Sequence, residues 1–153
     1  LMTKIQGVFF KKIKSNNDKR GFFREIFKDD FLIKKKLKQI SHSFIKKKII
    51  KAWHIHKKQS QWNYLLKGKI KLYLFDTRLS SKTFRKHTTL SIDSKKDSIM
   101  YFFPAGVAHG YITLSNENHM IYGTSGIYNP EEEFKMGLKN DLIPNFFNKS
   151  KKI

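Results

Sequence analysis

The stretch Lys51-Ala52-Trp53-His54-Ile55-His56-Lys57-Lys58-Gln59-Ser60-Gln61 carries two histidines within a run that is typical of a β-strand. Side chains at positions i and i+2 of a strand point to the same face of the sheet. His54 and His56 are therefore predicted to lie side by side. Gln61 follows five residues after His56, and Gly68 follows seven residues after Gln61.

A third histidine ends the segment Pro104-Ala105-Gly106-Val107-Ala108-His109, which follows another hydrophobic run. A His-x-His pair with a distant Pro-x-Gly-x-x-His indicates a small β-barrel that points its imidazoles into its own interior. We take that interior as the candidate functional site.

The remaining sequence reads as short strands separated by glycine, proline and polar turns, which favours an antiparallel all-β barrel or jelly roll. The expected strands cover residues 5–14, 39–50, 49–56, 62–76, 88–92, 98–103, 109–114 and 119–125. Residues 49–56 and 62–76 are expected to pair as a hairpin. Residues 15–18 are expected to form a turn, 28–38 a short helix and 131–133 an acidic turn. We expect one domain over residues 1–144 and a flexible basic tail over 145–153.

The formal net charge of +20 over 153 residues favours anionic partners. Nucleic acid, a phosphorylated small molecule and an acidic membrane surface are the candidates. Nucleic acid is disfavoured because lysine outnumbers arginine and is spread along the whole chain, whereas phosphate and base recognition favours the arginine fork. A merely solvated basic surface explains the charge equally well.

The chain contains no cysteine, which excludes disulfides and cysteine-based metal sites. No apolar run reaches the roughly 18 residues of a membrane span, and the N-terminus shows no secretory signal pattern. A cytoplasmic protein without a membrane span is the expectation.

The spacing of His54, His56, Gln61 and Gly68, followed by Pro104-x-Gly106-x-x-His109, resembles the two motifs of the cupins. This resemblance implies the double-stranded β-helix, an antiparallel jelly-roll barrel. It says little about function, because one fold carries many activities.

A closer resemblance, over most of the chain, is to the dTDP-4-dehydrorhamnose 3,5-epimerases and the related dTDP-4-keto-6-deoxyhexose 3,4-ketoisomerases. The segments that carry it are Arg20-Gly21-Phe22-Phe23-Arg24-Glu25, Gln39-Ile40-Ser41-His42-Ser43, Asp76-Thr77-Arg78 with Ser81-Lys82-Thr83, Pro104 to Tyr111, Tyr122, and Tyr128-x-Pro130-x-x-Glu133.

The resemblance implies an isomerase that moves protons next to the ketone of a dTDP-linked 4-keto-6-deoxyhexose, in deoxysugar and cell-surface polysaccharide biosynthesis. His54 would be the base and Tyr122 the acid, without a cofactor. The substrate-binding residues would be Arg20, Phe23, Glu25, Gln39, Lys51, His56, Gln61 and His109. A homodimer is implied, with Arg20 and Glu25 partly contacting the nucleotide across its interface.

Two departures from the epimerase pattern are visible. The family's lysine falls in the region where this chain has Gln59-Ser60-Gln61. The late aspartate that orients the catalytic histidine has no evident counterpart, so His54 is expected to lack a carboxylate partner. The run His54-x-His56-Lys57 instead resembles the ketoisomerases' His-Ala-His-Lys.

Other interpretations of the same residues stay open. His54, His56, Gln61 and His109 stand where cupins place their metal ligands, and could hold Zn²⁺ or Fe²⁺. His56 could equally be a second base, a substrate contact or a structural residue, and His109 a ligand or a structural support. A non-catalytic barrel that binds a sugar or an anion is a further possibility.

Overall fold

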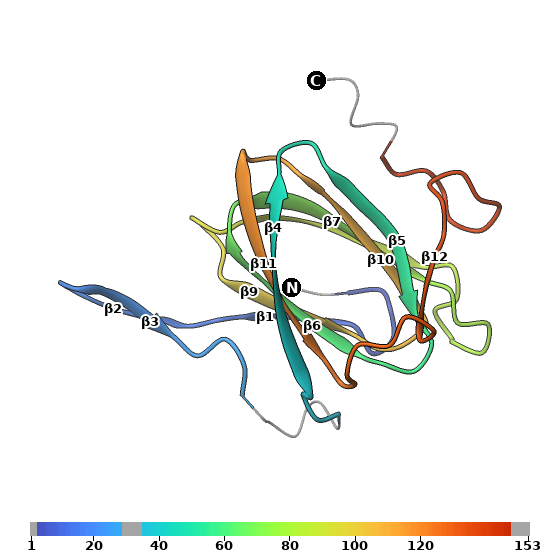
Figure 1. Ribbon diagram of the computed structural model, residues 1–153, viewed down its shortest axis with the longest axis horizontal. Coiled ribbons are helices and arrows are strands. Elements are labelled where there is room, and N and C mark those ends of the chain that lie inside the picture. The colour runs from blue at the N-terminus through green and yellow to red at the C-terminus, as the bar shows by residue number, and fades with distance from the viewer. Residues whose placement is uncertain (1–2, 29–34, 148–153) are drawn as a thin grey trace.

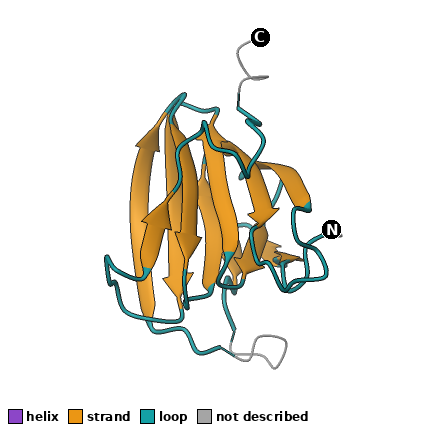
Figure 2. Ribbon diagram, turned by 90° about the vertical axis from the view of Figure 1, so that its right-hand side faces the viewer, coloured by secondary structure: helices purple, strands orange, loops and turns teal. Residues whose placement is uncertain are grey.

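The computed structural model describes residues 3–28 and 35–147, and within these ranges the chain consists of strands and loops without a helix (Figure 2). The predicted all-β class is confirmed. No described segment is a helix of the length and apolarity that crossing a membrane requires. The strands are β1 (Phe9–Lys12), β2 (Ser15–Asp18), β3 (Gly21–Arg24), β4 (Gln39–Lys46), β5 (Ile50–His56), β6 (Gln61–Lys67), β7 (Lys69–Asp76), β8 (His87–Asp93), β9 (Ile99–Phe103), β10 (Val107–Thr113), β11 (Glu117–Thr124) and β12 (Glu133–Lys135).

Two five-stranded antiparallel sheets face each other and form the barrel (Figure 1). The first sheet has the order β1-β9-β6-β11-β4, and the second sheet has the order β12-β5-β10-β7-β8. The strands β2 and β3 pair with each other as a separate hairpin that projects away from the barrel (Figure 1). The architecture is the antiparallel jelly roll that the sequence predicts.

The main core lies between the two sheets. Leu65 and Met120 point inward from the first sheet, while Leu72 and Leu74 point inward from the second, and all four are at most 2% exposed. Fully burying an aliphatic side chain of this size stabilises the fold by roughly 1.5–3 kcal/mol. This apolar layer fills most of the barrel and supports the polar cavity described below.

The outer face of the first sheet is also largely covered. Trp62 and Tyr64 on β6 point outward, and the segment that follows β3 packs Phe27 and Leu37 against this face. This cover explains why residues Gln61 to Leu65 of β6 are buried on both faces of the sheet, with Trp62 and Tyr64 outside and Gln61 and Asn63 inside.

The outer face of the second sheet is covered by the C-terminal segment. Phe146 and Phe147 stack on Trp53 and Tyr73 with ring centroids 4.7–6.1 Å apart, and Phe147 is buried. These contacts extend the folded part of the chain to residue 147, into the range predicted as a basic tail. Residues 148–153 lie outside the described residues.

The predicted strand over residues 62–76 is divided at Gly68 into β6 and β7. Gly68 has φ +111°, and a Cβ there would lie 2.4 Å from Oδ1 of the buried Asn118. Only glycine accepts both this backbone conformation and this close approach. The turn sends the chain from the first sheet to the second.

The predicted hairpin of residues 49–56 with 62–76 is wrong. β5 pairs with β10 and β12, while β6 pairs with β9 and β11 in the opposite sheet. Period-2 alternation identifies a strand and its inner face, but it carries no information about the partner strand. In a jelly roll, consecutive strands often belong to different sheets.

One further local prediction is wrong, and another falls mostly outside the described residues. Residues 15–18 form the strand β2, because their backbone pairs with β3 across a turn at residues 19–20. The predicted helix over 28–38 falls mostly on residues 29–34, which lie outside the described residues, and residues 28 and 35–38 are not helical.

Candidate active site

A cavity of about 220 Å³ opens between the two sheets and is lined by both of them. It brings together seven of the residues predicted for the site, namely Gln39, Lys51, His54, His56, Gln61, His109 and Tyr122. The first sheet provides Gln39, Gln61 and Tyr122, and the second provides the histidines and Lys51. The barrel interior that the sequence indicated as the site is therefore a polar pocket. One wall carries amide and phenol groups, and the other carries imidazole and amine groups.

Arg20, Phe23 and Glu25 lie elsewhere. Arg20 and Phe23 belong to the hairpin of β2 and β3, which projects from the barrel (Figure 1), and Glu25 follows it. None of the three lines the cavity. The Arg20 guanidinium binds the Asp18 carboxylate at 2.6 Å, and Phe23 is 65% exposed. Within one chain, these predicted substrate contacts are not brought to the pocket.

An irregularity in the pairing of β5 with β10 shapes the pocket. Tyr111 lies opposite Lys51 and His109 lies opposite His54, so β5 has one residue more than β10 between these two pairs. A bulge of this kind re-aims the side chains on one side of it. Lys51 and His54 therefore both line the cavity, although they are an odd number of residues apart.

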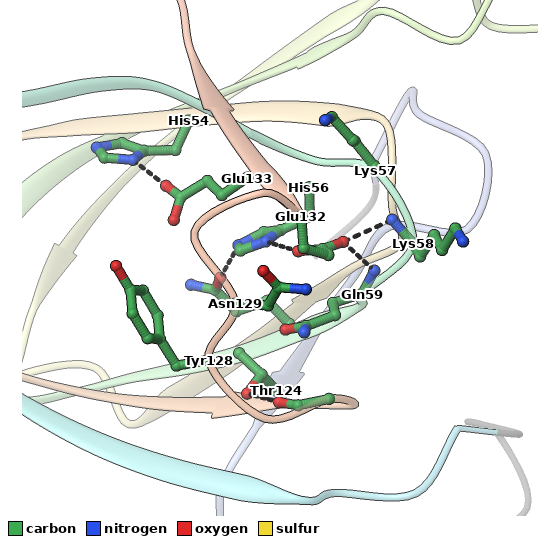
Figure 3. A network of polar contacts seen from close by, with 12 residues as sticks. His54, His56, Lys57, Lys58, Gln59, Thr124, Tyr128, Asn129, Glu132 and Glu133 are labelled. Carbon is green, nitrogen blue, oxygen red and sulfur yellow. Dashed lines mark hydrogen bonds and ion pairs between the residues drawn. The ribbon is translucent and has the colours of Figure 1, made fainter.

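His54 has a carboxylate partner, contrary to the expectation from the sequence. Its Nδ1 binds Oε1 of Glu133 at the start of β12, the edge strand that pairs with β5 (Figure 3). This contact fixes the ring orientation and places the proton of the neutral ring on Nδ1. Nε2 has no hydrogen-bond partner among the described residues. In the neutral ring this nitrogen carries a lone pair that can accept a proton.

His56 has a second carboxylate partner. Its Nδ1 binds Oε2 of Glu132 at 2.8 Å (Figure 3), and its Nε2 lies 2.8 Å from Oε1 of Gln61. Glu132 also accepts the backbone N–H groups of Lys58 and Gln59, each at 2.6 Å. Burial raises the pKa of Glu132, but these hydrogen bonds outweigh it and bring the pKa below its ordinary value.

His109 supports the two other histidines. Its ring lies parallel to that of His56 at 5.4 Å, near that of His54 at 5.8 Å and against Phe103 at 4.3 Å. Its Nδ1 donates to the carbonyl oxygen of Val107 at 3.2 Å. Burial, together with its two histidine neighbours, holds the pKa of His109 well below its ordinary value. His109 is therefore a neutral ring at physiological pH.

Tyr122 lies in the opposite sheet, within a cluster of hydroxyl groups. Ser43 donates to its Oη at 2.9 Å, and the hydroxyl of Tyr111 lies 2.6 Å from it. Burial raises the pKa of Tyr122, and these hydrogen bonds only partly oppose the shift. The hydroxyl therefore keeps its proton at neutral pH, as a general acid must.

Lys51 contributes positive charge to the pocket wall. It is half-buried, and burial lowers its pKa, with the nearby charge of Lys135 acting in the same direction.

The predicted metal alternative is not reflected in the geometry. Among residues 3–28 and 35–147, no three His, Cys, Asp or Glu side chains are grouped as a possible metal site. Both ring nitrogens of His56 already contact protein oxygens.

Sequence reasoning missed Glu132 and Glu133 as site residues: it described both as part of an acidic turn, and it used Glu133 in the motif Tyr128-x-Pro130-x-x-Glu133 without giving it a role. A signal was available, because three consecutive glutamates are unusual in a chain with 32 basic and 12 acidic residues. It also missed Asn63 and Tyr101, which continue a buried polar chain from Gln61. Their neighbours along the strands are apolar, so nothing in the pattern marked them.

Comparisons with known proteins point to one family. The family model described as dTDP-4-dehydrorhamnose 3,5-epimerase matches residues 2–143. The spore coat polysaccharide biosynthesis protein SpsL of Bacillus subtilis is 35% identical over 129 residues, which covers 84% of this chain and 85% of SpsL.

Two solved structures share the fold at appreciable identity. The dTDP-4-dehydrorhamnose 3,5-epimerase of Sulfolobus tokodaii is 31% identical with a TM-score of 0.78, over 86% of this chain and 77% of that one. The dTDP-6-deoxy-D-glucose-3,5-epimerase of Legionella pneumophila, in complex with dTDP-4-keto-L-rhamnose, is 27% identical with a TM-score of 0.81, over 88% and 74%. The chain is an isomerase with the cupin jelly-roll fold, and it belongs to the dTDP-4-dehydrorhamnose 3,5-epimerase family.

Proposed function

We propose that the protein epimerises or isomerises a dTDP-linked 4-keto-6-deoxyhexose at a carbon next to the ketone, without a metal. His54 Nε2 takes the proton from that carbon, and the C–H electron pair forms a C=C bond while the carbonyl oxygen becomes an enolate. The Tyr122 hydroxyl returns a proton to the opposite face of the ring. His54 then releases its proton to solvent, and the tyrosinate recovers one from solvent.

One observation carries the proposal: a carboxylate-oriented histidine and a protonated tyrosine come from opposite sheets into one cavity. A base and an acid on two walls can act on the two faces of a sugar ring between them. A base in place near neutral pH and a donor on the other side are what inversion at an acidic carbon requires. Glu133 stabilises the imidazolium that forms when His54 accepts the proton.

The substrate class follows from the family and from the charge of the pocket. Lys51 supplies a cation for an enolate oxygen or a diphosphate, acting as a point charge. The Legionella relative was solved with dTDP-4-keto-L-rhamnose, and the Bacillus relative is named for spore coat polysaccharide biosynthesis. We place this protein in deoxysugar supply for a cell-surface polysaccharide.

We further propose a homodimer in which the β2–β3 hairpin reaches the partner. Phe22 and Phe23 on the projecting hairpin are 61% and 65% exposed, and Ile40 and Phe44 on the outer face of β4 are 66% and 54% exposed. Apolar groups in such positions favour association. Dimerisation would give Arg20 and Glu25 access to a pocket that they do not reach within their own chain.

The test is solvent deuterium incorporation into dTDP-4-keto-6-deoxyglucose, followed by mass spectrometry and NMR. Wild-type protein is expected to incorporate deuterium next to the ketone, and His54→Ala is expected to abolish it. His87→Asn, on the edge strand β8 and outside the cavity, is the matched control and should keep full activity.

The products distinguish the remaining alternatives. Inverted configuration identifies an epimerase, and a moved carbonyl identifies a ketoisomerase. Binding of the nucleotide sugar without any exchange would mean a non-catalytic barrel and would overturn the proposal. Activity that is lost on chelation and restored by Zn²⁺ or Fe²⁺ would also overturn it, in favour of the metal cupin.

A further inference from the structure

His56 is set apart from His54 by having a protein partner at both ring nitrogens. Nδ1 contacts Glu132 and Nε2 contacts Gln61, each at 2.8 Å, and the side chain is only 11% exposed. A ring nitrogen in such a contact either donates or accepts, so the two partners together determine how many protons the ring carries.

The Glu132 contact makes Nδ1 a donor. Glu132 has its pKa below the ordinary value, and its other oxygen already accepts two backbone N–H groups, from Lys58 and Gln59. An ionised carboxylate only accepts hydrogen bonds. Nδ1 of His56 therefore carries a proton.

The Gln61 contact makes Nε2 a donor as well. Nε2 of Gln61 donates a hydrogen bond to Oδ1 of Asn63 at 2.8 Å, and Nδ2 of Asn63 donates one to Oη of Tyr101 at 3.1 Å. An amide that donates at one end of such a chain presents its oxygen at the other end. Oε1 of Gln61 consequently faces Nε2 of His56, and an N–H must lie between them.

The opposite direction of the chain is the competing state. With both amides reversed, Tyr101 would donate to Asn63, Asn63 to Gln61, and Gln61 to an unprotonated Nε2 of His56. In the direction found here, the Tyr101 proton is left with only a weak contact to the sulfur of Met120 at 4.0 Å. A charge-assisted bond between a His56 imidazolium and Glu132 compensates for this loss.

We propose that His56 is doubly protonated in the resting protein, because Glu132 and Gln61 each accept a hydrogen bond from its ring. This imidazolium gives the pocket a fixed positive charge for an anionic substrate oxygen. It is neither a second base nor a metal ligand, since neither ring nitrogen is open. The groups that face it are Glu132 and Glu133 from the C-terminal side, and His54 and His109 from β5 and β10. The neutral ring of His109 separates the charge of His56 from His54 without adding a charge of its own.

The protonation state is tested by long-range ¹H–¹⁵N correlation spectra of the histidine rings, with the His56 signals assigned by their loss in His56→Gln. Both ring nitrogens are expected to carry protons in the wild-type protein at neutral pH, because each of them faces an oxygen that accepts a hydrogen bond. Glu132→Gln should convert the ring to a neutral tautomer near neutral pH. A bare ring nitrogen in the wild-type protein at pH ~7 would overturn the assignment.

The role of the charge rests on the proposed function and is tested separately. In the deuterium-exchange assay, His56→Gln is expected to lower kcat by about tenfold to a hundredfold with little change in KM, because the charge acts on the enolate and not on the bound ketone. Glu132→Gln, which keeps the ring but removes its second proton, should show a loss of the same kind.

An unchanged kcat in both variants would overturn the charge role even if the ring is doubly protonated. Absence of exchange by the wild-type protein would instead reject the proposed function, and the NMR result would still decide the state of His56. Thermal unfolding of each variant identifies any loss of activity that is due to unfolding.

Discussion

The two histidine–carboxylate pairs of the pocket use the same residue types from the same two segments, yet they are built for different tasks. The His54–Glu133 pair leaves one ring nitrogen without a partner among the described residues, whereas the His56–Glu132 pair is closed by Gln61. A carboxylate partner alone therefore does not make a histidine a base. What occupies the second nitrogen decides whether the ring can exchange a proton or only carry one.

The largest expected effect comes from removing the carboxylate of the His54–Glu133 pair, called the open pair because Nε2 of His54 has no partner among the described residues. Glu133→Gln should lower the deuterium-exchange rate by about 10³-fold, because an amide neither fixes the tautomer of His54 nor stabilises its imidazolium. Glu133→Asp is the matched variant and should retain more activity. If Glu133→Gln exchanges as fast as the wild-type protein, the open pair is not the base.

Tyr122→Phe should have the next largest effect and should change the kind of product. Loss of its hydroxyl is expected to slow inversion by about 10²-fold, while deuterium exchange with retention persists through His54 alone. NMR of the product distinguishes the two outcomes. Tyr64→Phe on the outer face of β6 is the control, and unimpaired inversion by Tyr122→Phe would exclude Tyr122 as the acid.

The smallest effect on activity is expected at a carboxylate outside the pocket. The side chain of Asp76 is fully buried and accepts hydrogen bonds from Arg78, Ser81 and Thr83. Burial raises its pKa, but these donors prevail and lower it to about 2 from 3.8. Asp76→Asn should therefore cost about 2 kcal/mol of stability at neutral pH, with exchange kinetics unchanged.

The pH dependence of stability at Asp76 has a definite sign. A carboxylate with a depressed pKa in the folded state stabilises the protein above its unfolded pKa. This contribution is present in full above pH 3.8 and is lost as the pH falls toward about 2. Chemical denaturation across this range should show a steeper loss in the wild-type protein than in Asp76→Asn. Equal slopes would contradict the linkage.

Much of the fold could be predicted from the sequence because it depends on local patterns. Alternation along β4 predicts that Ile45 lies on the opposite face from Ile40 and Phe44, and in the structure Ile45 is buried while the other two are exposed. Strand partners could not be predicted in this way: β5 and β6 are neighbours in sequence but lie in opposite sheets. The predicted turn at residues 15–18 failed for the same reason, since strand pairing and not residue type decides its conformation.

The candidate site also has a part that local sequence patterns predicted and a part that they did not. The spacing of the cupin motifs identified His54, His56, Gln61 and His109, and His54 and His56 could be placed on one face because residues i and i+2 of a strand keep a fixed geometry. The partners of these histidines lie 76 and 79 residues away along the chain. No pattern in Glu131-Glu132-Glu133 indicated which glutamate meets which ring, or that either does.

The sequence by itself determined the all-β class, most strands of the two sheets, the family and the histidines that point into the barrel, because all of these depend on short-range spacing. Only the tertiary structure decided that β12 lies beside β5 and so gives His54 the carboxylate that it was expected to lack. It also decided that Gln61 contacts the second ring nitrogen of His56. The function of an imidazole depends on what contacts its two nitrogens, and those contacts exist only after the two sheets have closed into a barrel.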